Sequence, residues 1–372
     1  MKFNVSSKDL NDGLSAVIGA VPSKATLPIL ETILFESEDG KLKLTATDLE
    51  ISIIEYIEAD IEEEGSIAIP ARRLLETLRQ LPNIPVFFEV DENHNVEFKT
   101  DKGKYKLVGE EADEFPEIPD MDGGITLSTD TGLIQNAIDR TMFAVSTDDL
   151  RPAMMGVFFD IGTTQSKFVA TDGHRLVKYV NQDFKSDKPL SFIVPDKALH
   201  LVSKSLDSDD CELTVSDDHA QFSSGNTIVI TRLINEQYPN YDSVIPRDND
   251  KILLVDKAQM LSTVRRVSVF SSSTTRQIRL HLQKNKLTIR AEDLDMSSEA
   301  KETIACDYSA DEMEIGFNAK YLADVLNNVD GDEAKFEFST PNRAGIVKPA
   351  EESDEEQMLM LVMPVMLNSY GS

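Results

Sequence analysis

The chain has 372 residues, and its 41% hydrophobic and 28% charged content is typical of a folded protein with two or three domains rather than of a disordered chain. With 66 acidic against 37 basic residues it carries a formal net charge of −29, so an evenly charged surface would repel nucleic acid and anionic membranes. Apolar runs are too short to cross a bilayer, the N-terminal segment lacks a secretory pattern, and two cysteines are too few for a disulfide framework or a cysteine zinc site. We therefore expect a cytoplasmic protein.

Apolar residues recur with a period near 3.6 in six segments, which predicts six amphipathic helices. In chain order these helices are expected at residues 7–20, 70–81, 129–145, 195–206, 255–270 and 317–329. Short runs of β-branched or aromatic residues, bounded by Gly, Asn or Asp, lie between and after them, for example at 32–35, 86–90, 157–159, 227–231 and 335–338. Such runs are typical of antiparallel strands joined by hairpins.

One pattern of strand, turn and helix occurs three times along the chain. In each copy an alternating strand runs into an aspartate, and these residues are Asp48, Asp172 and Asp293. In each copy a second strand ends shortly after the aspartate, at a residue where a helix is predicted to start. These end residues are Pro70, Pro195 and Asn318, which lie 22, 23 and 25 residues after the respective aspartates. Two anchors at nearly equal offsets indicate tandem repeats. We predict an α+β fold of three similar domains, each with two helices and an antiparallel sheet, at residues 1–122, 123–247 and 248–372.

The charge is distributed unevenly between the predicted helices and the rest of the chain. The six helices hold eleven basic and eight acidic residues, so they are net basic and all of the excess negative charge lies outside them. If the helices shared one side of the molecule, that side would be mildly basic and could hold a polyanion loosely. The count is equally compatible with a simple preference of Lys and Arg for exposed helix positions.

Several motifs together carry a resemblance to a known family. They are ATDGHRL at 170–176, MKF at 1–3, TLPIL at 26–30, EMEIGFN at 312–318 and VMPVML at 362–367. With the repeat lengths and the motif order, they resemble the bacterial DNA polymerase III beta subunits, the sliding clamps, over the whole chain. The resemblance implies a head-to-tail homodimer that closes into a ring, with helices lining the hole and sheets outside, around duplex DNA.

The resemblance also implies partners and site residues. A clamp loader opens the ring, and DNA polymerase subunits and repair proteins dock through short linear peptides in a peptide-binding pocket; no catalytic residue, cofactor or metal is implied. The implied pocket consists of Met154, Thr171, Gly173, His174, Arg175, Leu176, Pro239, Val244, Leu361, Val362, Met363, Pro364, Val365 and Met366. The implied DNA-facing residues are Lys24, Arg72, Arg73, Arg140 and Lys197, and the implied dimer contacts are Leu107, Val269 and Phe270. A carboxylate or carbonyl of the bound peptide is expected to meet Arg175 or His174.

The sequence departs from the family pattern in four places. The segment 148–154 lacks the polar and aromatic residues that touch DNA in some relatives, and Asp148 would repel DNA. Ser243 replaces a base found in the pockets of some relatives. The loop 340–347 aligns poorly, so no pocket residue is assigned there, and the tail 368–372 extends beyond the usual end of the family.

Two other functions remain open from the residues themselves. An enzyme with an acid/base site at Asp172 and His174 would need a third group oriented on the histidine, whereas a Gly-containing turn with polar tips needs no chemistry. An acidic repeat scaffold could bind peptides without encircling DNA. Such a scaffold shares the pocket and differs in ring closure, so the mass in solution distinguishes it from a clamp.

Overall fold

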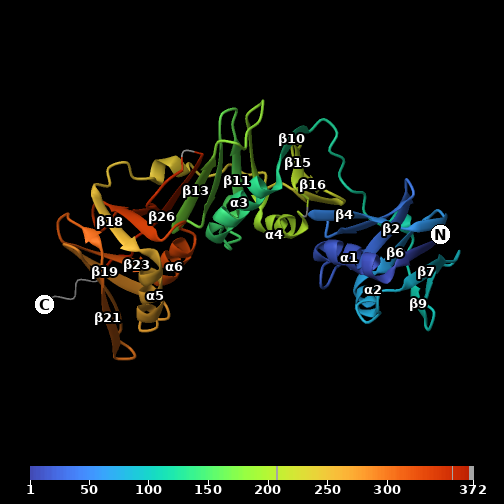
Figure 1. The fold of residues 1–372 in the computed structure, drawn as a ribbon, viewed down its shortest axis with the longest axis horizontal. Helices are drawn as coiled ribbons and strands as arrows, with labels where there is room; N and C mark the ends of the chain where they lie inside the picture. Colours follow the sequence, from blue (N-terminus) through green and yellow to red (C-terminus); the bar gives the residue numbers. More distant parts are fainter. Residues whose placement is uncertain (207, 354, 368–372) are drawn as a thin grey trace. The chain divides into compact units, whose positions relative to one another are not determined.

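The computed structural model describes residues 1–206, 208–353 and 355–367 (Figure 1). The contacts within the chain define two units. The first contains residues 1–135 and 197–233, and the second contains residues 136–196 and the chain from 234 onward. The tail 368–372, for which the sequence suggests no role, lies outside the described residues.

All six helices that the periodicity predicts are present in the described residues. They are α1 (Ser7–Val17), α2 (Ala71–Leu78), α3 (Thr131–Thr141), α4 (Asp196–Ser205), α5 (Lys257–Ser268) and α6 (Ala319–Asn327). Each is shorter than predicted, because adjoining strands take the residues before α2 to α6, and 3-10 helices, turns or irregular residues follow the helices. The side chains of Asp256 and Asn318 mark two of the starts, since they accept hydrogen bonds from the first free backbone N–H groups of α5 and α6.

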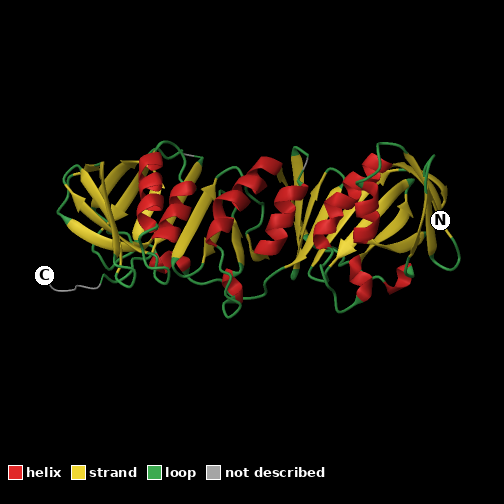
Figure 2. Ribbon diagram, turned by 90° about the horizontal axis from the view of Figure 1, so that it is seen from below, coloured by secondary structure: helices red, strands yellow, loops and turns green. Residues whose placement is uncertain are grey.

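The first unit contains two antiparallel sheets. One has the order β5 (Asp60–Glu63), β1 (Lys2–Ser6), β7 (Pro85–Val90), β8 (Asn95–Lys99) and β9 (Lys104–Val108). The other has the order β10 (Ile125–Asp130), β15 (Asp210–Val215), β16 (His219–Ser224), β17 (Thr227–Arg232), β4 (Ile51–Glu58), β3 (Lys41–Thr47), β2 (Thr32–Glu38) and β6 (Ser66–Pro70). Helix α1 packs against β3 and β4 and beside α2, with Leu10 and Leu14 fully buried. Figure 2 shows these helices lying over the strands of the unit.

The second unit is built in the same way. One sheet has the order β14 (Leu190–Pro195), β11 (Gly156–Ile161), β12 (Ser166–Thr171), β13 (Arg175–Asn181), β26 (Glu356–Val362), β25 (Gly345–Pro349), β24 (Glu333–Phe338), β18 (Lys251–Asp256) and β22 (Asp307–Tyr308). The other has the order β21 (Ser298–Ala305), β20 (Lys286–Asp293), β19 (Gln277–Gln283) and β23 (Met313–Asn318). Helices α5 and α6 pack side by side, and α5 covers β20 and β21.

The middle third of the sequence contributes strands to both units. Strand β17 pairs with β4, with Ile230 opposite Ser52, and β13 pairs with β26, with Val177 opposite Met360. Hydrogen-bonded sheets therefore run from one sequence repeat into the next. The predicted domain boundaries, at 122/123 and 247/248, follow the sequence repeats, whereas the two units follow the continuity of the sheets. The boundaries therefore stay a prediction.

Aromatic side chains fill much of the core in both units. In the first, Phe3 stacks on Phe88 at 4.8 Å between ring centroids, and Phe88 stacks on Phe98 at 5.2 Å. In the second, Phe159 meets Phe168 edge to face at 5.0 Å.

None of the helices in the described residues has the length and apolar composition that crossing a membrane requires.

Candidate functional site

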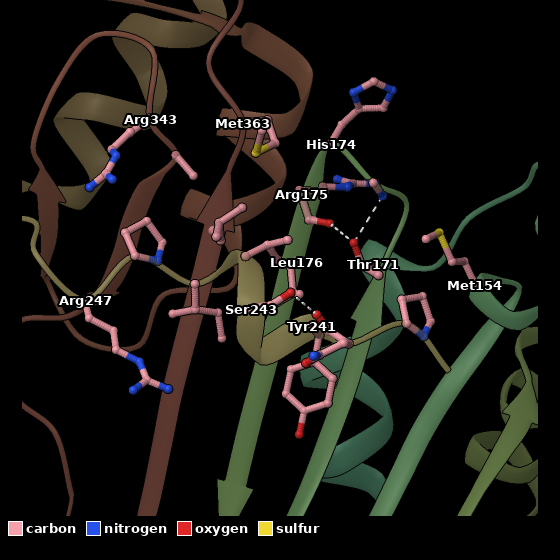
Figure 3. Close-up of a pocket in the computed structure, with 18 of the residues that line it drawn as sticks. Met154, Thr171, His174, Arg175, Leu176, Tyr241, Ser243, Arg247, Arg343 and Met363 are labelled. Carbon is pink, nitrogen blue, oxygen red and sulfur yellow. Dashed lines mark hydrogen bonds between the residues drawn. The ribbon is translucent and has the colours of Figure 1, made fainter. Parts of the chain in front are cut away.

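A cavity of about 600 Å³ opens in the second unit (Figure 3). Its walls come from the turn between β12 and β13, the 3-10 turn η6 (Tyr241–Val244) with the loop that follows it, the turn between β24 and β25, and the end of β26. Segments nearly 200 residues apart in the chain meet here because β13 and β26 are paired neighbours in one sheet. The site thus depends on the long-range pairing between the middle and last repeats.

Most of the implied pocket residues line this cavity. They are Met154, Thr171, Gly173, His174, Arg175, Leu176, Pro239, Val244, Leu361 and Met363. The remaining four, Val362, Pro364, Val365 and Met366, are not among the residues that line it in the described part of the chain. Val362 is the neighbour of Leu361 in β26, and successive side chains of a strand point to opposite faces, so it points away from the cavity. Pro364, Val365 and Met366 lie beyond the end of this strand. The chain then leaves the site, since the Val365 amide donates to the Gly316 carbonyl of β23 at 2.9 Å.

The cavity has further walls that the sequence did not identify. These residues are Asn240, Tyr241, Ile245, Pro246, Arg247, Asp248, Asn342, Arg343 and Ala344. Ser243, which replaces a base found in the pockets of some relatives, lines the cavity too. They lie in two connections without regular periodicity, so hydrophobic patterning gives no signal for them. The turn at 342–344 belongs to the loop for which the family comparison offered no assignment.

The floor of the cavity is apolar. Leu176, Tyr241, Ala344 and Leu361 belong to one buried cluster with Val169 beneath them. The Tyr238 hydroxyl donates to the Val169 carbonyl at 3.2 Å. Burial raises the pKa of Tyr241 to about 12, so the ring stays neutral and the floor carries no charge at physiological pH.

The turn from Thr171 to Arg175 is held by its own side chains. The Asp172 carboxylate accepts the backbone N–H groups of His174 and Arg175, each at 2.9 Å, and the Thr171 hydroxyl donates to the Arg175 carbonyl at 2.7 Å. Gly173 has a φ of +85°, which favours glycine. Asp172 thus acts as a turn-forming residue, and the exposed His174 ring stacks on Tyr321 at 5.6 Å.

Arg175 is already engaged within the chain, and its expected contact with a carboxylate or carbonyl of a bound peptide stays a prediction. Its side chain is only 9% exposed, and its guanidinium pairs with Asp172 at 3.2 Å and with Asp324 of α6. The same group stacks over the Tyr321 ring at 5.0 Å and the Phe143 ring at 5.5 Å. A buried charge needs such partners, so Arg175 braces the turn against α6 while its backbone and side chain line the cavity.

The implied DNA-facing bases fall into two groups. Lys24, Arg72 and Arg73 are exposed. Lys197 pairs with Asp48, and its side chain is still 59% exposed. Arg140 differs, because its guanidinium pairs with Asp330 and Glu356 and covers the Tyr179 ring at 5.3 Å. With two carboxylates already bound, Arg140 offers a phosphate less free charge than the exposed bases do, and its place among the DNA-facing residues stays a prediction.

The segment 148–154, where the sequence departs from the family, forms a braced loop. Arg151 pairs with Asp148 at 2.9 Å and donates to the Asp172 carbonyl at 2.8 Å. The backbone N–H of Leu150, together with Arg151, holds the pKa of Asp148 below its usual range. The Leu150 side chain is 89% exposed.

The implied dimer contacts lie at the surface. Leu107 is half-buried in β9, the last strand of its sheet, and β21 is the first strand of its own sheet. Val269 and Phe270 follow α5 and are 78% and 41% exposed. Phe270 is therefore not a core residue.

Within the described residues, no group of three or more His, Cys, Asp or Glu is arranged to hold a metal ion.

Comparison with known proteins extends over the whole length of the chain. Family models described as the N-terminal, central and C-terminal domains of the DNA polymerase III beta subunit match residues 1–119, 128–240 and 242–364. The beta sliding clamp of Pseudomonas aeruginosa is 30% identical over 371 residues, covering 99% of this chain and all of that protein. The beta sliding clamp of Bacillus subtilis is 28% identical, covering 98% and 99%.

Solved structures agree with the fold. A sliding clamp from Pseudomonas aeruginosa, bound to griselimycin, superposes with a TM-score of 0.93 at 29% identity and covers 99% of this chain and 100% of that one. The DNA polymerase sliding clamp from Bacillus subtilis gives 0.93 at 27% identity and covers 99% of each chain. The chain therefore belongs to the family of DNA polymerase III beta subunits, the beta sliding clamps.

Proposed function

We propose that two copies of this chain close head to tail into a ring that encircles duplex DNA and tethers DNA polymerase to it. The observation that carries the proposal is the similarity to beta sliding clamps across all three family domains and nearly every residue. The proposed activity is processivity without catalysis, and the expected cytoplasmic location stays a prediction.

Two exposed sheet edges support ring closure. Strand β9 ends its sheet with the exposed Lys104 and Lys106, which pair with Glu97, and β21 begins its sheet with the exposed Glu299 and Lys301. An uncovered edge of this kind is a template for pairing with another chain. Burial of Val269 and Phe270 against Leu107 of the second copy would cover the neighbouring apolar surface.

DNA binding is proposed to be topological and independent of sequence. The bases proposed to face the duplex are Lys24, Arg72, Arg73, Arg140 and Lys197. Contacts of Lys and Arg with phosphates position a protein on DNA without reading the bases, which suits a ring that slides. With a net charge of −29, binding of DNA to an open surface of the chain would be weak.

The cavity of the second unit is proposed to receive the partners. An apolar floor with a few polar groups at its rim suits a short peptide with Leu and Phe anchors. Polymerase subunits, the clamp loader and repair proteins would each carry such a segment. The structure of a similar clamp contains bound griselimycin, which supports ligand binding in this family.

Retention on DNA tests the ring directly. The protein is loaded by a clamp loader onto nicked circular DNA, and the circle is then linearised while an uncut sample serves as the control. A ring should slide off the ends, so retention should fall only after cutting. Equal retention on cut and uncut DNA would refute encirclement.

The mass in solution separates the clamp from an acidic scaffold that binds peptides without encircling DNA. Light scattering should give twice 41.4 kDa for the clamp. A monomer at micromolar concentration would favour the scaffold.

A further inference from the structure

We infer that the pocket selects peptides that carry side-chain carboxylates beside their apolar anchors, through Arg247 and Arg343. This inference rests on the proposed peptide-binding function and specifies the chemistry of its partners. It concerns two residues that lie outside the implied pocket and that the structure adds to its walls.

The charge of the pocket walls is opposite to that of the chain as a whole. The lining residues include three arginines and one aspartate, whereas the whole sequence has 29 more acidic than basic residues. Arg175 is neutralised by Asp172 and Asp324 and is buried. The charge available to a ligand therefore comes from Arg247, Arg343 and Asp248.

These three residues leave a net positive charge at the rim. Arg343 pairs with Asp248, and the two side chains are 53% and 67% exposed. Arg247 is exposed, and no ion pair joins it to another described residue. Nearby acids outside the lining have their own bases, since Lys178 lies 3.2 Å from Asp242 and Lys251 lies 3.3 Å from Asp250.

Both arginines are placed on the same side of the cavity. Figure 3 shows them on the side away from Met154 and Thr171, across the apolar floor formed by Leu176. A peptide that fills the floor would bring its flanking residues to this side. The geometry thus joins an apolar anchor site to a basic rim.

The two segments that carry the arginines are fastened together. The Asn249 side-chain amide donates to the Glu337 carbonyl at 2.8 Å and to the Ala344 carbonyl at 3.2 Å. This ties the loop of Arg247 to the turn of Arg343, and the Arg343 amide closes that turn on the Thr340 carbonyl at 3.1 Å. Fixed backbones reduce the ordering cost when a carboxylate binds.

The size of the effect follows from exposure. Ion pairs at solvent-exposed sites are individually weak, so two arginines should favour an acidic peptide over its amide analogue by about threefold to tenfold. Salt should reduce this preference, because exposed charges are screened. Binding through the apolar anchors should depend much less on salt.

The test uses fluorescein-labelled, C-terminally amidated peptides of identical length with Leu and Phe anchors. Two carry Asp pairs, placed before or after the anchors, and two carry Asn pairs at the same positions. Anisotropy is measured on the full chain, on Arg247→Gln with Arg343→Gln, and on the control Arg79→Gln with Arg232→Gln, which removes two exposed bases elsewhere. Asp248→Asn is the fourth protein.

At least one of the two Asp peptides should bind the full chain and the control variant more tightly than the Asn peptide of the same layout. The Arg247/Arg343 variant should lose this difference in affinity. Asp248→Asn should tighten the Asp peptide by about twofold to threefold, because it removes the competing carboxylate. Equal binding of Asp and Asn peptides to the full chain, or a preference that survives in the Arg247/Arg343 variant, overturns the inference while leaving the pocket assignment intact. Failure of all four peptides to bind overturns the pocket function and the inference with it.

Discussion

Removing the exposed apolar pair after α5 should convert the dimer into a folded monomer. The perturbation is Val269→Ala with Phe270→Ser. Full burial of a Val or Phe side chain stabilises a protein or interface by about 1.5–3 kcal/mol. With 78% and 41% of the two residues exposed, covering them would contribute about 2–3 kcal/mol at one interface. A head-to-tail dimer has two such interfaces, so the double variant should lose about 4–6 kcal/mol, or roughly three to four orders of magnitude in the dissociation constant.

The assay is light scattering over a concentration series, with thermal unfolding to show that the variant is folded. The matched control is Leu49→Ser with Leu150→Ser, because these side chains are 52% and 89% exposed but lie outside the proposed contact. The control should remain dimeric. A change of less than tenfold in the dissociation constant of the Val269/Phe270 variant would show that the interface has been placed wrongly.

Three smaller predictions follow from the pocket and the sheets. Met363→Ala should weaken binding of a Leu/Phe peptide by about 1–2 kcal/mol, because Met363 lines the cavity. Met366→Ala, at a 78% exposed residue outside the lining, should leave binding unchanged by anisotropy, and equal effects of the two changes would contradict this assignment of the cavity walls. Gly173→Ala should lower the unfolding temperature more than Gly331→Ala, although both glycines have positive φ. A Cβ at 173 would lie 2.6 Å from the Arg151 guanidinium, which would have to move and lose its hydrogen bond to the Asp172 carbonyl, whereas a Cβ at 331 meets nothing within 4 Å. Similar losses would argue against that contact. Hydrogen bonds from neighbouring lysines lower the pKa of Glu97 from 4.5 to about 2. Glu97→Gln should therefore be less stable than the native chain above pH 4.5 in thermal melts, and this difference in stability should disappear as the pH falls towards 2. A difference in stability that is independent of pH would refute the assignment.

Local patterns in the sequence determined the secondary structure and the repeats. Helix periodicity predicted α1 to α6, and the residues that end the preceding strands, such as Asn318, indicated where three of them start. The ATDGHRL motif indicated a tight turn, and Gly173 adopts the positive φ that such a turn requires. These features depend on residues close together in the chain, so sequence reasoning reaches them.

Only the tertiary structure decided which side chains share the pocket and what charge they offer. Arg175 and Arg140 are bases in the sequence, yet Asp324 and Asp330, some 150 to 190 residues away, take up their charges. Arg247 and Arg343 reach the same rim because their two connections are tied through Asn249. Periodicity and propensity are local, whereas these contacts depend on sheet pairing between distant strands, such as β13 with β26, and on which face of a strand each residue occupies.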